Sequence, residues 1–245
     1  MQFGVQLYTL RTVADSIETR IERVGETAFE GVEFAGVDAE SPAVIRDALD
    51  RQGLEPVAAH VSFEALEADL ETTLETYRGI GCPELVVPSY DSSAFQSAEK
   101  AKAAGHRLAE LRDRCLEAGI ELSYHNHSFE FTALEEETAF DRFLGAADGV
   151  GLELDCGLTL RGGVDPGSIL DRYADRIRLL HLTDSTPHSE DPPHLDLGDG
   201  EVDLEGCLAI AEEAGVEWGL FEHGVSDDPL GSMEQAESVL QELTR

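Results

Sequence analysis

The chain has 245 residues, of which 51 are acidic and 17 basic, and its formal net charge at pH 7 is −34. Such a charge repels polyanions, so we expect no binding to nucleic acid or to an anionic membrane. The abundance of carboxylates, with Lys100 and Lys102 as the only lysines, also predicts an acidic protein of the kind found in halophilic proteomes, where salt screens self-repulsion.

Short apolar runs alternate with amphipathic stretches along the whole chain. The runs predict buried strands at residues 2–8, 31–34, 55–61, 84–88, 120–125, 150–155, 177–182 and 218–223. The amphipathic stretches predict helices near residues 15–28, 41–52, 64–80, 95–118, 136–147, 166–174, 203–214 and 231–243. Eight strand–helix units are enough to close a parallel barrel. We therefore predict an α/β fold, a (β/α)8 TIM barrel, with residues 1–245 as one domain.

Other general features of the sequence favour a cytoplasmic protein. No stretch approaches the ~20 apolar residues of a membrane span, and the first residues enter a strand pattern without a basic region or a cleavage site. The four cysteines are far apart and form no C-x-x-C pair, so we expect buried, reduced thiols. A homo-oligomer is left open by the sequence.

Acidic or histidine side chains stand where several of the predicted strands end. His60 ends PVAAH, Glu130 follows ELSYHNHSF, Asp155 ends GLELD, His181 ends IRLLH and Glu222 ends WGLFE. In an eight-fold barrel the carboxyl ends of all strands meet at one face, so residues far apart in the sequence come together there. The pattern predicts one shared site at the mouth of the barrel.

A divalent cation is the simplest occupant of that site. Glu130, Asp155, His181 and Glu222 offer three carboxylates and one imidazole, a mixed oxygen and nitrogen set suited to Mn²⁺, Mg²⁺ or Zn²⁺. A bound cation would also allow several anions to lie close together. Taken one at a time, each residue could instead be a helix cap, a core histidine or an ion-pair partner; their position at the same end of four strands favours a metal site.

The remaining histidines fall into two groups. His125 and His127 lie on the same side of their strand by period-two alternation, and with His60 they are candidates to position substrate or relay protons. Core packing is an equal alternative for His60. No role is assigned to the other four histidines, which are His106, His188, His194 and His223. We expect His188 and His194, which lie in the acidic loop at residues 183–202, to be solvated. A loop of this length is typical of a lid or binding loop.

Several segments resemble a known family. They are LYTLR (7–11), GVEFAG (31–36), YHNHSFEF (124–131), LELDCG (152–157), GGVDP (162–166), RIRLLHLTD (176–184), LGDGEVD (197–203) and GVEWGLFEH (215–223). In this order they resemble the sugar phosphate isomerase/epimerase group of the xylose isomerase-like (AP endonuclease 2-type) barrel superfamily. The resemblance covers essentially the whole chain and specifies the superfamily better than the substrate.

The resemblance implies a metal site. Ketose epimerases of that superfamily bind their metal through Glu, Asp, His and Glu, and the two glutamates shuttle protons. Asp155, His181 and Glu222 match three of those positions, whereas the first glutamate falls at Ser123 here. Glu130 would have to supply that ligand from further on, or His127 would replace it. The family's frequent lysine after the histidine strand is Thr183 in this chain.

We therefore expect a divalent-metal-dependent sugar or polyol isomerase or epimerase that acts by proton transfer through a metal-stabilised enediolate. Glu222 and Glu130 would be the base and the acid. Loss of a β-hydroxyl at the same site would instead give an inosose-type dehydratase. A non-catalytic sugar-binding barrel is a third reading. Endonuclease IV-like cleavage of DNA is disfavoured by the net charge of −34.

Overall fold

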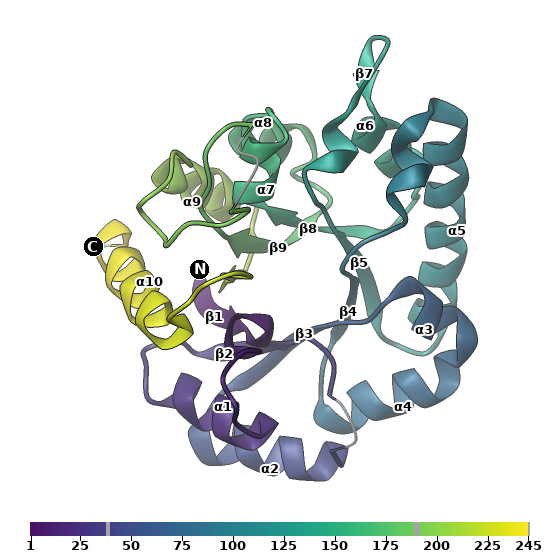
Figure 1. The fold of residues 1–245 in the computed structure, drawn as a ribbon. Coiled ribbons are helices and arrows are strands. Elements are labelled where there is room, and N and C mark those ends of the chain that lie inside the picture. Colours follow the sequence, from purple (N-terminus) through teal and green to yellow (C-terminus); the bar gives the residue numbers. More distant parts are fainter. Residues whose placement is uncertain (38–39, 189–191, 245) are drawn as a thin grey trace.

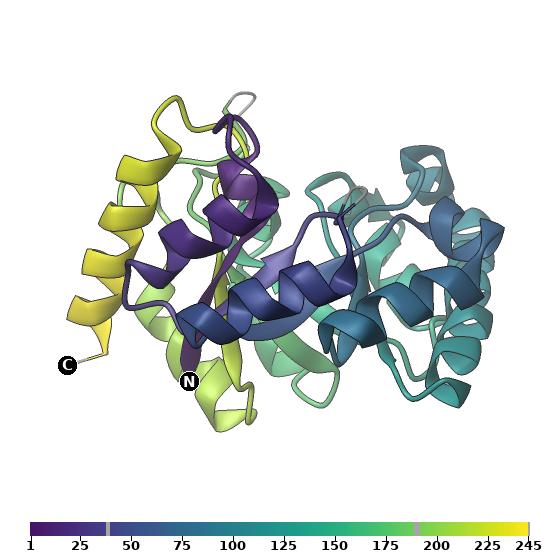
Figure 2. The same cartoon turned by 90° about the horizontal axis from the view of Figure 1, so that it is seen from below.

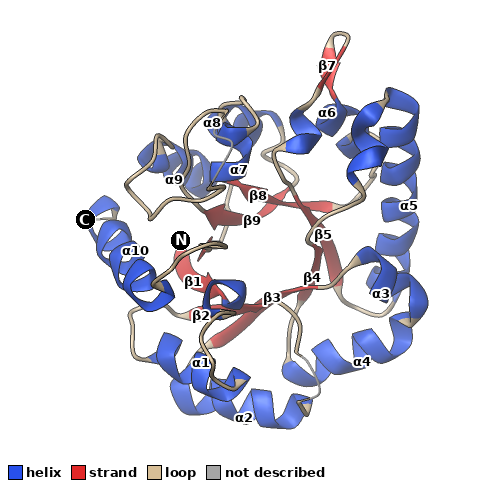
Figure 3. Cartoon of the chain, viewed as in Figure 1, coloured by secondary structure: helices blue, strands red, loops and turns tan. Residues whose placement is uncertain are grey.

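The computed structural model describes residues 1–37, 40–188 and 192–244. Eight parallel strands close into a ring in the order β1-β10-β9-β8-β5-β4-β3-β2, and helices surround the ring (Figure 1, Figure 3). The predicted TIM barrel is confirmed. The barrel strands are β1 (Gln2–Gln6), β2 (Gly31–Phe34), β3 (Glu55–His60), β4 (Glu84–Val87), β5 (Glu121–His125), β8 (Gly151–Asp155), β9 (Ile177–Leu182) and β10 (Trp218–Phe221). Each lies within a predicted run.

The outer helices also follow the prediction, with additions that the periodicity did not show. They are α1 (Ile17–Gly25), α2 (Pro42–Gln52), α3 (Phe63–Ala68), α4 (Leu70–Ile80), α5 (Ala98–Glu117), α6 (Ala139–Leu144), α7 (Cys156–Arg161), α8 (Pro166–Arg172), α9 (Leu204–Glu213) and α10 (Pro229–Leu243). The single helix predicted at residues 64–80 is two helices, because Asp69 leaves the helical conformation and its carboxylate caps the start of α4. The unpredicted α7 starts directly after β8.

Smaller elements lie in the connections that follow the barrel strands. Three 3-10 helices, η1 (Leu7–Leu10), η2 (Ser92–Gln96) and η3 (Phe129–Phe131), follow β1, β4 and β5, and β6 (Ala133–Leu134) pairs with β7 (Glu137–Thr138) as a hairpin. In Figure 2 the two chain termini lie near each other at the lower end of the barrel. The carboxyl ends of the strands point to the opposite end.

Apolar side chains from both faces of the sheet build the core. Between strands and helices lies one large buried cluster, which includes Phe34, Tyr124, Phe140 and Phe221. All four cysteines are buried and unpaired, as predicted. Among the described residues no helix has the length and apolarity that crossing a membrane requires.

Candidate metal centre and active site

A cavity of about 690 Å³ opens at the carboxyl ends of the strands. Its wall is largely apolar, with Val61, Leu158 and Val225 among the lining side chains. Its polar groups include a set of histidines and one glutamate that lie toward the barrel axis: His60, His125, His127, His194 and Glu222. A mostly apolar pocket with a few convergent polar groups is typical of a small-molecule site.

Four buried side chains converge beside this cavity. His125, Asp155, His181 and Glu222 each offer one ligand atom, and these atoms all lie within 4.8 Å of one another. They come from β5, β8, β9 and the residue after β10, and the β8–β9 register places Asp155 directly opposite His181. Three of the four predicted ligands are therefore together, and His125 is the fourth member of the group.

The hydrogen bonds of His125 direct a lone pair into this group. Its Nδ1 lies 3.1 Å from the carbonyl oxygen of Pro88, which can only accept, so Nδ1 carries the proton. The Nε2 of the neutral ring is then an acceptor, and it faces Oδ2 of Asp155 at 3.4 Å. Neither atom has a hydrogen-bond partner, although both are buried. Two buried acceptors that face each other need a cation or a proton between them.

The two carboxylate oxygens of Asp155 have different roles, one in the fold and one at the site. Oδ1 accepts from the backbone N of Leu158 at 2.6 Å and from Oγ1 of Thr183 at 2.5 Å, so it caps α7 and leaves Oδ2 for the centre. Burial would raise the pKa of Asp155, but the nearby imidazoles of His125 and His194 hold that pKa below its usual value. Asp155 is therefore ionised at neutral pH.

His181 bridges the site to a deeper layer of the barrel. Its Nδ1 lies 3.1 Å from Oε2 of Glu222, and its Nε2 lies 2.7 Å from Oε2 of Glu33. Burial lowers the pKa of His181, but the carboxylates of Glu153 and Glu33 outweigh burial and raise it well above the usual value. When Nε2–H donates to Glu33 in the neutral ring, Nδ1 keeps its lone pair for the centre. Burial would raise the pKa of Glu222, but the hydrogen bond and the charge of His181 outweigh burial and hold that pKa below its usual range.

A second buried cluster lies on the other side of His181. His60 Nε2 is 2.7 Å from Oε2 of Glu153, His181 Nε2 is 3.3 Å from Oε1 of Glu153, and Gln6 Nε2 donates to Oε2 of Glu33 at 2.8 Å. Burial and the charge of Glu153 raise the pKa of Glu33. Burial would raise the pKa of Glu153, but His181 and His60 outweigh burial and lower that pKa well below its usual value. Carboxylates that hold the far nitrogen of a histidine ligand fix its orientation and its tautomer.

Sequence reasoning missed both glutamates of this deeper cluster. Glu153 stands two residues before Asp155 in GLELD, so strand alternation places both on the same face. Glu33 lies in the centre of GVEF and is completely buried inside the barrel. An acid within a buried strand was the available signal in both cases.

Glu130, a predicted ligand and catalytic group, occupies a different place. It lies in η3, fully buried, and its carboxylate accepts from Oη of Tyr124 at 2.7 Å and from the backbone N of His127 at 2.8 Å. Among the described residues it belongs to neither group of converging ligand atoms. Burial, opposed by the hydrogen bond from Tyr124, raises the pKa of Glu130 to about 7.

This raised pKa gives a prediction for folding stability. Because the folded pKa of Glu130 exceeds the unfolded value, stability is fully present below about pH 4.5 and is lost as the pH rises toward 7. We expect the free energy of unfolding of the wild type to lose up to about 3 kcal/mol through this group between pH 5 and pH 8. Glu130→Gln, which cannot ionise, should lack that component. Urea unfolding of both proteins across this pH range measures the difference; parallel pH profiles would contradict it.

The predicted substrate-positioning histidines all line the cavity. His60 is partly buried at the end of β3, and His127 follows β5 with its ring at 5.3 Å from the ring of His125. Burial and the nearby His125 lower the pKa of His127 to about 4, so this ring is neutral at pH 7. Their contact with a substrate stays a prediction.

The loop after β9 brings a further histidine into the site. His194 was expected to be solvated, but this was wrong: it is only 5% exposed and it lines the cavity. The loop turns back because both oxygens of Asp184 collect backbone N–H groups, from Ser185 and Val202 on Oδ1 and from Gly198 and Gly200 on Oδ2. His188, from the same loop, is exposed as expected.

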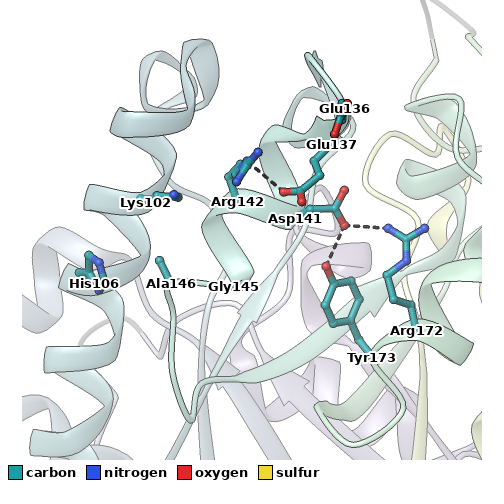
Figure 4. Close-up of a pocket in the computed structure, with 10 residues that line it drawn as sticks. All are labelled: Lys102, His106, Glu136, Glu137, Asp141, Arg142, Gly145, Ala146, Arg172 and Tyr173. Atoms are coloured by element: carbon teal, nitrogen blue, oxygen red, sulfur yellow. Dashed lines mark hydrogen bonds and ion pairs between the residues drawn. The ribbon is translucent and has the colours of Figure 1, made fainter.

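A second cavity of about 620 Å³ lies on the outer wall, between α5, α6 and the end of α8 (Figure 4). Four of its charged groups form two ion pairs: Arg172 Nη1 contacts Oδ1 of Asp141 at 2.8 Å, and Arg142 Nε contacts Oε2 of Glu137 at 2.9 Å. Tyr173 donates to Asp141 as well. These are solvated ion pairs far from the barrel axis, so we place the chemistry at the strand ends.

Comparison with known proteins agrees with this fold. Residues 21–243 match the model of the xylose isomerase-like TIM barrel family, and the chain belongs to that family. The resemblance described from the sequence is thereby confirmed.

Similar curated proteins include inosose dehydratases. That of Geobacillus kaustophilus is 27% identical over 191 residues, which cover 67% of this chain and 60% of the relative. That of Lacticaseibacillus casei is 24% identical over 237 residues, which cover 82% and 79%. The rhizopine catabolism protein MocC of Rhizobium meliloti is 23% identical over 223 residues, covering 82% and 68%. The chain thus matches less than two thirds of the length of the Geobacillus protein.

Solved structures show the same fold. A sugar phosphate isomerase/epimerase from Parabacteroides distasonis superimposes with a TM-score of 0.82 at 20% identity, covering 98% of this chain and 93% of that one. The IolI protein, solved with a zinc atom, gives a TM-score of 0.81 at 16% identity, covering 99% and 98%. At these identities the matches establish the fold alone.

Proposed function

We propose that this protein is a divalent-metal-dependent enzyme that dehydrates a neutral keto-polyol. The observation that supports this proposal is the group formed by His125, Asp155, His181 and Glu222, in which buried acceptor atoms face one another. The relatives named inosose dehydratase favour the same reaction class.

The donor set fits a transition-metal ion. Two imidazole nitrogens and two carboxylate oxygens suit Mn²⁺ or Zn²⁺ better than Mg²⁺, which prefers oxygen ligands and retains water. His125 would bind through Nε2 and His181 through Nδ1, the nitrogens that their other hydrogen bonds leave as acceptors. When bound, the cation would withdraw electron density from a carbonyl and so acidify the neighbouring C–H.

The positions of Glu222 and Glu130 favour dehydration over a reaction in which two glutamates carry the proton. Glu222 lines the cavity and would take the proton from the carbon next to the carbonyl. Glu130, the expected second carrier, instead accepts hydrogen bonds from Tyr124 and His127. In a dehydration the hydroxyl on the next carbon would leave as water after it takes up the proton that Glu222 has removed, so no second base is required on the opposite face.

Isomerisation or epimerisation is the second candidate. Either reaction needs a group that returns the proton, to the neighbouring carbon or from the other face. His127 is a described residue that could do this, because it lines the cavity and its buried Nδ1 has no hydrogen-bond partner. The proton would then return to the sugar skeleton with retention of all hydroxyls.

The cavity also argues for an uncharged substrate. No Lys or Arg is among the described residues that line it, and the sequence has neither residue at positions 38–39 or 189–191. Phosphate recognition generally uses such cations or a phosphate-cradling loop. A sugar phosphate would therefore meet no lysine or arginine side chain among the described residues of this cavity.

The test is an assay of chelator-treated protein with and without added Mn²⁺. We expect turnover of an inosose to stop on chelation and to return with Mn²⁺, with an absorbance increase from the unsaturated product. Proton NMR in D₂O on unphosphorylated ketoses separates the second candidate, because epimerisation would incorporate deuterium without loss of water. Full activity of the metal-free protein, or no turnover of any neutral keto-polyol or ketose, would overturn the proposal.

A further inference from the structure

We propose that His194 donates a hydrogen bond from Nε2 to an oxygen of the bound substrate, and is thus a substrate-contacting residue supplied by the long loop. This inference rests on the proposed function and adds a residue to it. Neither strand-end position nor strand periodicity indicated His194, because it lies in an irregular acidic segment.

The first step is that the loop fixes the position of His194. The next residue, Leu195, donates its backbone N–H to the carbonyl of Asp184 at 2.9 Å and forms an isolated bridge with it. The Asp184 carboxylate in turn accepts the backbone N–H groups of Gly198, Gly200 and Val202. His194 is therefore attached to the end of β9 through hydrogen bonds on both sides of the loop.

The second step concerns which ring nitrogen carries the proton. The backbone N of Gly224 lies 3.0 Å from Nδ1 of His194, and a backbone N–H can only donate. Nδ1 is therefore the acceptor, and the proton of the neutral ring is on Nε2. The ring of His223 lies edge-on to that of His194, with centroids at 6.1 Å and an angle of 83° between the rings, and it makes no hydrogen bond with Nε2.

The third step is that this N–H has no partner within the protein. His194 Nε2 is buried without a hydrogen bond, and it lies 3.8 Å from Oδ2 of Asp155 across the centre, beyond hydrogen-bond distance. A buried donor that lacks a partner destabilises the folded protein, so its retention favours a ligand that supplies the acceptor. The cavity that His194 lines is the place from which such a ligand would reach it.

The fourth step separates His194 from the ligating histidines. In the neutral rings His125 Nε2 and His181 Nδ1 are acceptors toward the centre, as a metal ligand must be. His194 presents N–H to the same centre and lies outside the group of four converging ligand atoms. A donor aimed where negative charge develops on a substrate oxygen stabilises that charge. The ring therefore acts on the substrate and not on the cation.

The test uses Co²⁺-loaded protein and acetohydroxamate, a small bidentate oxygen ligand that carries a negative charge. Co²⁺ affinity and hydroxamate affinity are both read from the visible spectrum of the cobalt. For His194→Leu we expect hydroxamate affinity to fall about 10- to 100-fold, the range for loss of a hydrogen bond to a charged group. Co²⁺ affinity should remain within about twofold of the wild type, because the substitution removes neither a ligand atom nor a hydrogen bond to a ligand.

Two further variants control this result. His194→Gln keeps an N–H donor near the position of Nε2 and should restore part of the hydroxamate affinity. His188→Asn, in the same loop but exposed and at a φ of 55° that asparagine tolerates, should change neither affinity. An unchanged hydroxamate affinity in His194→Leu would overturn the inference, and so would a loss of Co²⁺ affinity, which would make His194 a ligand. Failure of the wild type to bind Co²⁺ would refute the proposed function instead.

Discussion

Replacement of Asp155 by asparagine is expected to reduce the affinity for Mn²⁺ by more than about 100-fold, and turnover with it. Removal of groups that merely support a ligand costs about 10- to 100-fold in metal affinity, so loss of a ligand should exceed that range. Asparagine keeps an oxygen for the backbone N of Leu158 and for Thr183. Its amide nitrogen would replace Oδ2 and donate to His125 Nε2. Two acceptors would then no longer face each other, so this contact would not require a cation.

Titration calorimetry with Mn²⁺ measures this change directly. Because the cap of α7 is retained, we expect the thermal unfolding of metal-free Asp155→Asn to resemble that of the metal-free wild type. The wild type alone should gain stability when Mn²⁺ is added, since a ligand that binds only the folded state stabilises it. Equal stabilisation of both proteins by Mn²⁺ would show that Asp155 is not a ligand.

Glu33→Gln is expected to lower the affinity for Mn²⁺ by about 10- to 100-fold without removing any ligand atom. Glu33 Oε2 accepts from both His181 Nε2 and Gln6 Nε2. A glutamine oxygen at the position of Oε2 could accept both hydrogen bonds, but it carries no charge, so it would hold the N–H of His181 less strongly than a carboxylate does. Its amide nitrogen would replace Oε1, which lies 3.4 Å from His60 Nε2. The contact that keeps the His181 proton on Nε2 and the lone pair on Nδ1 would thereby weaken.

A buried glutamate at the other end of the barrel provides the matched control. Glu84 begins β4, accepts a hydrogen bond from Ser123 and pairs with Arg178 Nε at 3.0 Å. Glu84→Gln should lower the free energy of unfolding, because it leaves a half-buried arginine without its charge partner, while Mn²⁺ affinity stays the same. If both variants lower the metal affinity equally, the effect of Glu33→Gln reflects general loosening of the barrel and not the orientation of His181.

The strands could be predicted from the sequence because each is a short apolar run, and their shared direction then placed Asp155, His181 and Glu222 together. How far along the barrel axis each side chain lies could not be predicted in the same way. His125 was assigned to substrate because neither its contact with Pro88 nor the length of β5 can be read from periodicity. Two registers shift, between Val32 and Glu33 and between Leu152 and Glu153, at the residues of the deeper cluster.

Segments outside regular elements were the least predictable part of the site. Glu130 follows its strand closely enough to reach the mouth, but η3 directs it toward Tyr124. The position of His194 depends on contacts with Asp184 and Gly224, which are 10 and 30 residues away in the sequence. For Asp155 the sequence suggested either a helix cap or a site residue. It can be both, because Oδ1 caps α7 while Oδ2 is left without a hydrogen bond at the centre.

The anchoring of the long loop by Asp184 has a kinetic consequence. A segment that must be ordered by each incoming substrate loses conformational entropy in every catalytic cycle, and its opening often limits the rate of product release. Here a buried carboxylate already holds four backbone N–H groups, and a methyl group at Gly200 would collide with it. The described residues around Asp184 are thus held in place before a substrate arrives, and we expect bond breaking rather than loop motion to set the rate.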